Sequence, residues 1–256
     1  MIEDFITAAE AAADVAAAAI KPLFRRHLAV ERKSDASPVT IADRSAELAM
    51  RGVLSQWFPT HSVYGEEFGE LNPGQRYRWV LDPVDGTRAF VTGRPQFGTL
   101  IALLDGERPI VGVIDQPITG ERWIGAHGLA TRFRGAYGHV GTRPCSALSD
   151  AELSVTSPAM FGPDLPRWER LREATKRVTY GGDCYAYGLL ALGQIDIIAE
   201  ATMQPWDWAA LVPIIEGAGG SITDWQGAAL SPHGDGRVLA VGDPSVLGAA
   251  IAVLGE

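Results

Sequence analysis

Four carboxylates in this chain stand where apolar runs end, and their types and spacing suit metal chemistry. They are Glu66, Asp82, Asp85 and Asp207. Asp82 and Asp85 follow the apolar run at 79–81, with Pro83 between them. Two carboxylates at the end of a hydrophobic run repel each other and lose hydration, so something must compensate them. Mg²⁺ is a suitable candidate, because it prefers oxygen ligands and binds through a few carboxylates, waters and substrate phosphate.

The residues that follow the two aspartates suit a phosphate group. Pro83 fixes the approach of the chain, and the carbonyl of Val84 can point toward the same ions. Gly86 and Thr87 offer backbone N–H groups at the start of a short helical turn, which is a phosphate-binding arrangement. Cations bound by the acids would then contact one side of a phosphate, and the backbone N–H groups of the turn would contact the other side.

Each acid also has a simpler interpretation, and two other phosphate motifs are absent. Glu66 could lie in a solvated turn, Asp85 in a β-turn, and Asp207 at the cap of a helix. The D-x-D-G-T motif of haloacid dehalogenase phosphatases does not fit, because Pro83 stands two residues before Asp85. Water is therefore the expected attacking group. The P-loop motif G-x-x-x-x-G-K-[ST] does not occur.

The composition is that of an ordinary globular protein and argues against a nucleic-acid partner. The chain has 256 residues, of which 46% are hydrophobic and 21% charged, and its net charge is −9. Nucleic-acid binding needs clustered Lys and Arg. Cys145 and Cys184 lack metal-ligand spacing and are expected to be reduced thiols. The first 20 residues lack the basic start of a signal peptide and the length of a membrane span, so we expect a cytoplasmic protein without a membrane partner.

The elements that must position the acids change character along the chain. Apolar residues at helical spacing predict a helix over 5–23 and a second over about 40–57, begun by Thr40 and Asp43 in capping-box form. Apolar runs between turn residues then predict a largely antiparallel sheet. These runs lie at 61–67, 78–83, 97–106, 108–117 and 121–128.

Strands and helices alternate beyond residue 149, which is typical of an α/β lobe. The predicted strands are 177–182, 195–201, 221–225 and 237–243, and the predicted helices are 185–193, 206–220 and 244–255. We therefore predict an α+β and α/β layered sandwich. Residues 1–148 would form the N-terminal lobe with most of the acids, and residues 149–256 a C-terminal lobe with Asp207, packed together as one unit.

Three motifs resemble the inositol monophosphatase superfamily of Mg²⁺-dependent phosphatases. They are GEE at 65–67, DPVDGTRAF at 82–90 and PWDWAA at 205–210, and their order and separation agree with that family. The family signature D-P-[IVL]-D-G-T and the downstream W-D-x-A are both matched. The resemblance extends from the first helix to the last. It implies a layered αβαβα sandwich, a homodimer, and two or three Mg²⁺ ions per site, with Mn²⁺ as a substitute.

The resemblance also implies a role for each matching residue. The metal ligands would be Glu66, Asp82, Asp85, Asp207 and the Val84 carbonyl. Thr87 would hydrogen-bond the attacking water, with Asp43 behind it as proton acceptor and Glu66 beside it in the catalytic group. Gly86 and Thr87 would contact the phosphate. Asp43 could instead be only a capping acid, and Lys33, which matches a basic residue near the site in relatives, could be a solvated loop lysine.

Within the superfamily the chain resembles the histidinol-phosphate phosphatases of inositol-monophosphatase type. The discriminating stretches are RAF at 88–90, GRP at 93–95 and GDC at 182–184. Histidinol phosphate carries an ammonium and an imidazole, so its pocket should offer acidic groups. Glu200 aligns with a substrate-contacting acid of the family, and Asp183 would add a second carboxylate facing the same cavity. Asp85 would also contact the substrate. Asp183 could instead be a turn residue, and Arg88 could contact either the phosphate or these acids.

We therefore expect a phosphatase that hydrolyses L-histidinol phosphate, a step of histidine biosynthesis, by means of an activated water. Two alternatives stay open. The first is an inositol-1-monophosphatase or a broader sugar-phosphate phosphatase on the same scaffold. The second is a metal- or phosphoester-binding protein without turnover, although Thr87 and Asp43 argue for catalysis.

Overall fold

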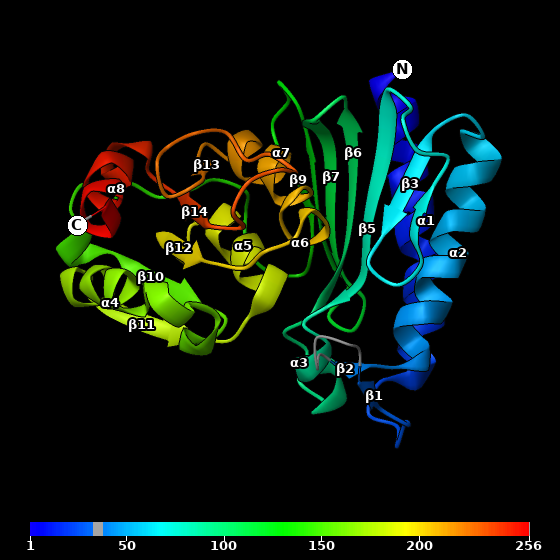
Figure 1. The fold of residues 1–256 in the computed structure, drawn as a ribbon, viewed down its shortest axis with the longest axis horizontal. Coiled ribbons are helices and arrows are strands. Elements are labelled where there is room, and N and C mark those ends of the chain that lie inside the picture. The colour runs from blue at the N-terminus through cyan, green and yellow to red at the C-terminus, as the bar shows by residue number, and fades with distance from the viewer. Residues whose placement is uncertain (33–37, 256) are drawn as a thin grey trace.

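The chain folds into alternating layers of helices and sheets (Figure 1). The structure, a computed structural model, describes residues 1–32 and 38–255. In this part of the chain, α1 (Ile2–Ile20) and α2 (Ile41–Trp57) cover one face of the first sheet. Between the two sheets lie α5 (Asp183–Ala191), α6 (Pro205–Trp208) and α7 (Leu211–Gly217), and α4 (Leu165–Ala174) and α8 (Leu247–Gly255) cover the outer face of the second sheet. This is the layered αβαβα sandwich that was predicted.

The first sheet contains seven strands in the order β4-β3-β5-β6-β7-β8-β9. Its strands are β3 (Ser62–Gly65), β4 (Gly69–Leu71), β5 (Tyr77–Asp85), β6 (Gly98–Asp105), β7 (Arg108–Gln116), β8 (Glu121–Ala126) and β9 (Arg132–Arg134). Neighbours are antiparallel except β3 and β5, which run parallel. The five predicted runs are confirmed as strands, whereas the short edge strands β4 and β9 were not predicted. A separate pair, β1 (Glu31–Arg32) and β2 (Pro38–Val39), is antiparallel.

The second sheet contains five strands in the order β11-β10-β12-β14-β13. Its strands are β10 (Glu152–Val155), β11 (Arg177–Tyr180), β12 (Ile197–Glu200), β13 (Ser221–Thr223) and β14 (Val238–Val241). β10 is parallel to both of its neighbours, and the remaining pairs are antiparallel. β10 and α4 were missed by the sequence analysis. Half of the residues of α4 are charged, and only Trp168 and Leu171, spaced by three, are fully buried on it.

Successive residues of β12 face opposite layers, as the alternation of a strand requires. Ile198 packs into the core between the two sheets together with Leu100 and Trp123. Ile197 and Ala199 instead pack into the outer core with residues of α4 and α8. A third core joins α1 and α2 to the outer face of the first sheet.

Two glycines let the middle helices approach the first sheet closely. A Cβ at Gly112 would lie 2.0 Å from the carbonyl oxygen of Ala210, and a Cβ at Gly125 would lie 2.4 Å from the backbone nitrogen of Ile214. A side chain at either position would push α6 and α7 away from the sheet. Because α6 carries Asp207, these glycines set how close that acid comes to β5.

The lobe boundary predicted at residue 148 falls between β9 and β10, so each sheet is formed on one side of it. The division into two lobes stays a prediction, since one hydrophobic core includes residues of both sheets. No helix in the described residues is long and apolar enough to cross a membrane.

Candidate active site

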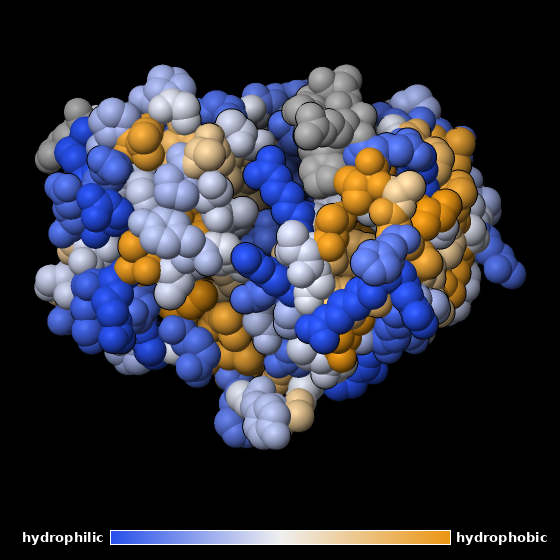
Figure 2. Space-filling view, turned by 90° about the horizontal axis from the view of Figure 1, so that it is seen from below, coloured by the Kyte–Doolittle hydropathy of each residue, from blue (hydrophilic) through white to orange (hydrophobic). Residues whose placement is uncertain are grey.

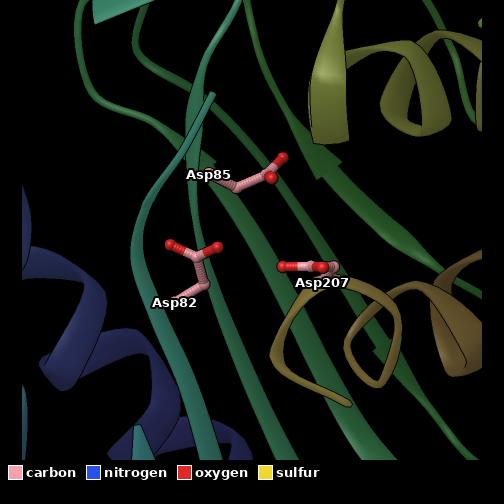
Figure 3. A group of neighbouring side chains, drawn as sticks. All are labelled: Asp82, Asp85 and Asp207. Atoms are coloured by element: carbon pink, nitrogen blue, oxygen red, sulfur yellow. The ribbon is translucent and has the colours of Figure 1, made fainter. Parts of the chain in front are cut away.

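The carboxyl end of β5 carries the two acids of the DPVD motif (Figure 3). The pairing of β5 with β6 shifts register between Asp82, which lies opposite Leu100, and Asp85, which lies opposite Gly98. Residues three apart would face opposite sides of a regular strand, and the extra residue of this bulge brings both acids to one side. Within the bulge the N–H of Val84 donates to Oδ1 of Asp82 at 3.0 Å.

Asp207 completes a group of three carboxylates, which we call the aspartate group. An oxygen of each of Asp82, Asp85 and Asp207 lies within 4.8 Å of the other two, and Figure 3 shows the three side chains pointing toward one another. Asp207 also caps α6, because the N–H of Gln204 donates to its Oδ2 at 2.7 Å. Asp207 is therefore not the N-cap of a following helix, but it takes part in the capping box of α6 and in the aspartate group.

Burial makes the carboxyl groups of the aspartate group weaker acids than ordinary aspartates. It is the largest cause that raises the pKa of Asp82 well above its usual value, that of Asp85 to about 8 and that of Asp207 to about 7. The charges of neighbouring acids raise these pKa values further. A cation would offset both effects, and carboxylate oxygens at this spacing fit a hard divalent ion such as Mg²⁺. The aspartate group could therefore hold a metal ion.

Glu66 lies beside the aspartate group, on the turn between β3 and β4. The backbone N–H of Glu66 donates to the carbonyl of Leu81 at 3.1 Å, which ties this turn to β5. The charge of Glu66 raises the pKa of Asp82 and of Asp207, so its carboxylate is close to both. The structure thus brings together all four acids of the predicted site.

Asp43 and Thr87 meet next to the β5 bulge. The hydroxyl of Thr87 lies 3.4 Å from Oδ1 of Asp43 and 3.1 Å from the carbonyl oxygen of Val84. Oδ2 of Asp43 accepts from the N–H of Thr40 at 2.8 Å and from its hydroxyl at 2.7 Å. The predicted capping box is confirmed, and Asp43 reaches Thr87 with its second oxygen. Burial raises the pKa of Asp43.

The predicted phosphate-binding turn is the start of α3 (Thr87–Val91). Gly86 precedes this helix with a φ of 88°, a conformation that favours glycine. A Cβ at Gly86 would lie 3.0 Å from Cγ and Oδ2 of Asp183. Gly86 therefore brings the backbone of this turn against the first residue of α5.

Asp183 and Glu200 form a second acidic region. The pKa of Asp183 is raised to about 8, chiefly by burial and then by the charge of Asp85. Burial also raises the pKa of Glu200, although its Oε1 accepts from the N–H of Thr156 at 2.8 Å and its Oε2 from the hydroxyl of Tyr187 at 3.0 Å. We call Asp183 and Glu200 the acid pair.

Two cavities meet at Asp183. A small one, of about 90 Å³, is lined by Asp85, Asp207 and the acid pair. A larger one, of about 240 Å³, shares Asp183 and includes Arg88 and Arg94. On the face shown in Figure 2, hydrophilic residues gather between the two halves of the molecule. Arg88 is exposed, and its charge lowers the pKa of Asp183, whereas Lys33 lies outside the described residues.

Several supporting residues were not predicted from the sequence. The N–H of Cys184 donates to Oδ2 of Asp85 at 2.5 Å, and Thr156 and Tyr187 hold Glu200. These partners lie far from each other along the chain, so no local pattern could have found them. Glu47 was not predicted either. It follows Asp43 by four residues and so lies on the same face of the helix, which is a signal that the sequence does contain.

The layered fold and its acidic site define a class, the phosphatases of inositol-monophosphatase type. The model of the inositol monophosphatase family matches residues 1–254. The chain belongs to this family, and it is a phosphatase of the family.

Relatives and solved structures agree with this membership. A bifunctional phosphatase IMPL2, chloroplastic, of Arabidopsis thaliana is 48% identical over 88% of this chain and 66% of its own length, so the match spans just under two thirds of that protein. A histidinol-phosphatase of Streptomyces coelicolor is 37% identical over 90% of each chain. A solved inositol monophosphatase from Zymomonas mobilis is 46% identical, with a TM-score of 0.90 over 99% of this chain and 98% of that one.

Proposed function

We propose that this phosphatase hydrolyses L-histidinol phosphate to L-histidinol and phosphate. The observation that carries the proposal is the acid pair, Asp183 and Glu200, on the small cavity beside the aspartate group. Their raised pKa values mean that ionisation is costly without a positive partner. The ammonium and imidazole of histidinol phosphate supply such a partner, whereas the hydroxyls of inositol do not.

The proposed metal is Mg²⁺, with Mn²⁺ as a substitute. Its ligands would be Glu66, Asp82, Asp85, Asp207 and the carbonyl of Val84. When bound, it supplies positive charge that stabilises the phosphate oxygens and eases the ionisation of water. The chain can supply the rest: Thr87 would orient the water, and Asp43, 3.4 Å from its hydroxyl, would receive the proton. Backbone N–H groups at Gly86 and Thr87 would hold the phosphate.

A second candidate is hydrolysis of inositol or sugar phosphates. The favouring observation is the larger cavity, where Arg88 and Arg94 offer positive charge to a polyhydroxyl or second anionic group. The similarity to the Zymomonas mobilis inositol monophosphatase supports it as well. The histidinol-phosphatase of Streptomyces coelicolor supports the first proposal.

The test is phosphate release from L-histidinol phosphate and inositol 1-phosphate, each measured over a range of concentrations with and without Mg²⁺. We expect a higher kcat/KM for L-histidinol phosphate and no turnover in excess chelator. A preference for inositol 1-phosphate would exclude the histidinol phosphate proposal and leave the phosphatase intact. Absence of turnover on every ester would favour a binding protein.

We also propose a homodimer, which rests on the family resemblance. Light scattering on the purified chain would give twice the mass of one chain if the proposal is correct. A single-chain mass at micromolar concentration would contradict it.

A further inference from the structure

Glu47 is a fully buried carboxylate on α2 that has no part in the chemistry proposed above. Its exposed fraction is 0%, and it lies one helical turn after Asp43. Isolated buried charge is strongly unfavourable, so a carboxylate at this position needs several donors. The structure supplies three of them, from Arg51, Glu67 and Phe68.

These donors connect α2 to the turn that carries Glu66. Oε1 of Glu47 accepts from Nε of Arg51 at 2.8 Å and from the N–H of Phe68 at 3.2 Å. Oε2 accepts from the N–H of Glu67 at 2.7 Å. Since the N–H of Glu66 is bonded to Leu81, three successive backbone N–H groups of the turn have assigned partners.

Arg51 holds the strands on both sides of the same turn. Its guanidinium donates to the carbonyl of Val63 on β3 at 3.3 Å and to the carbonyl of Gly69 on β4. The side chain of Arg51 is only 11% exposed, and that of Glu47 is 0% exposed, so the ion pair is shielded from solvent. The pair therefore acts on the turn from inside the protein.

Gly65 provides the space that this contact needs. A Cβ at Gly65 would lie 2.1 Å from Oε1 of Glu47 and 2.7 Å from its Oε2. The oxygens of Glu47 therefore occupy the place where a side chain of residue 65 would begin. Any larger residue at 65 would displace the carboxylate from the turn.

We propose that Glu47, with Arg51 and the space at Gly65, is a positioning residue that directs the carboxylate of Glu66 toward the aspartate group. The inference rests on the proposed role of Glu66 as a metal ligand. A buried ion pair is weak evidence for stability, because well-packed apolar residues are often as stable. Its specific consequence here is the geometry of the turn, since an apolar residue at 47 would leave two N–H groups without acceptors.

The test compares Glu47→Gln with a matched control, Asp196→Asn. Asp196 is also buried, at 1% exposed, and accepts from Arg143 and from the N–H of Glu152. It lies just before β12 in the other half of the fold and binds no residue of the turn at 66–68. Each variant removes the charge of a buried carboxylate that accepts from an arginine and from a backbone N–H. Both substitutions should therefore lower the midpoint of thermal unfolding.

The decisive readout is metal binding to the substrate-free protein, measured by Mn²⁺ electron paramagnetic resonance, with the Mg²⁺ dependence of kcat beside it. We expect Glu47→Gln to weaken metal binding at least about 10-fold, as loss of a partner behind a ligand does, and Asp196→Asn to leave it unchanged. Wild-type metal affinity in a folded Glu47→Gln protein would overturn the proposal. If that variant does not fold, Arg51→Lys keeps the charge but not the fork to Val63 and Gly69, and the same two outcomes apply.

A double variant separates this inference from the function on which it rests. If Glu47 acts through Glu66, Glu47→Gln should not weaken metal binding further in a Glu66→Gln background. An equal loss in both backgrounds would contradict the positioning role. If Glu66→Gln alone keeps wild-type affinity, the proposed role of Glu66 fails, and the positioning role fails with it while the phosphatase assignment stands.

Discussion

The aspartate group and the acid pair both consist of buried or half-buried acids, but they are built in different ways. The three acids of the aspartate group have oxygens within 4.8 Å of one another and share one small volume. The acid pair comes from α5 and β12, and Glu200 already has a backbone N–H and a tyrosine hydroxyl as donors. The crowded set needs a cation to relieve mutual repulsion. In the other set only Glu200 is held by protein donors, and the pKa of Asp183 stays raised to about 8 although the charge of Arg88 lowers it.

The difference suggests a division of labour. A crowded group that lacks sufficient donors is suited to a metal ion, because only concentrated charge offsets the cost of bringing the acids together. A pair in which hydrogen bonds hold Glu200 and Asp183 lines both cavities is suited to discriminate between substrates. The following variants test that division, beginning with the largest expected effect.

Asp85→Asn should produce the largest loss. Asparagine keeps the shape of the side chain but removes one charge from the aspartate group, so metal affinity and kcat/KM should both fall by at least about 100-fold. Thermal unfolding should show a folded protein, because the mutual repulsion also decreases. Phosphate release and Mn²⁺ titration measure the two effects, and wild-type activity in this variant would remove the aspartate group from the mechanism.

Thr87→Ala should slow the chemical step without lowering the affinity for the metal. The hydroxyl lies between Asp43 and the carbonyl of Val84, and losing a group that orients a proton transfer costs about 100-fold in rate. Single-turnover kinetics at saturating Mg²⁺ would show the loss. Thr7→Ala on the exposed side of α1 is the control, and equal rates in the two variants would contradict the assignment.

Asp183→Asn should change substrate preference more than total activity. The φ of Asp183 is 44°, which asparagine tolerates, so the backbone should be kept. Removing this charge should lower kcat/KM for L-histidinol phosphate at least about 10-fold and that for inositol 1-phosphate by less. An equal loss for both substrates would assign Asp183 to the aspartate group and contradict its role in discriminating between substrates.

The metal-free protein should lose stability as the pH rises. The pKa of Asp207 is raised to about 7 and that of Asp85 to about 8, so the folded state holds protons that the unfolded state has released above its ordinary pKa near 4. The contribution of these two groups to the free energy of unfolding is then greatest below about pH 4, and it declines as the pH rises to about pH 8. In chelator, the thermal midpoint should fall by on the order of 5 °C between pH 5.5 and 8.5, and Mg²⁺ should restore more stability at the higher pH. A midpoint that rises over this range would contradict the raised values.

The two regions also differ in how well the sequence predicts them. The aspartate group lies in a motif with strong local signals: Pro83 lies in the bulge of β5, and Gly86 precedes α3 with a positive φ. The acid pair was identified from family resemblance and substrate chemistry. Its partners Thr156 and Tyr187 belong to other elements, and the N–H that reaches Asp85 comes from Cys184, 99 residues away.

The same distinction explains the elements that were missed. α2 was predicted because Thr40 and Asp43 form a local capping box, which is confirmed. Half of the residues of α4 are charged, and the helix is stabilised by burying Trp168 and Leu171 against the second sheet. Contacts of that kind depend on a surface formed elsewhere in the chain.

The sequence by itself determined the parts that depend on near neighbours: the proline between the aspartates, the capping box of α2, and the glycine before α3. Backbone sterics and short hydrogen bonds act within a few residues, so they are readable without a fold. Only the tertiary structure decided that Asp207 approaches Asp82 and Asp85, and that Glu47 supports the turn of Glu66. Burial and charge repulsion depend on which surfaces pack together, and packing is settled by the whole chain.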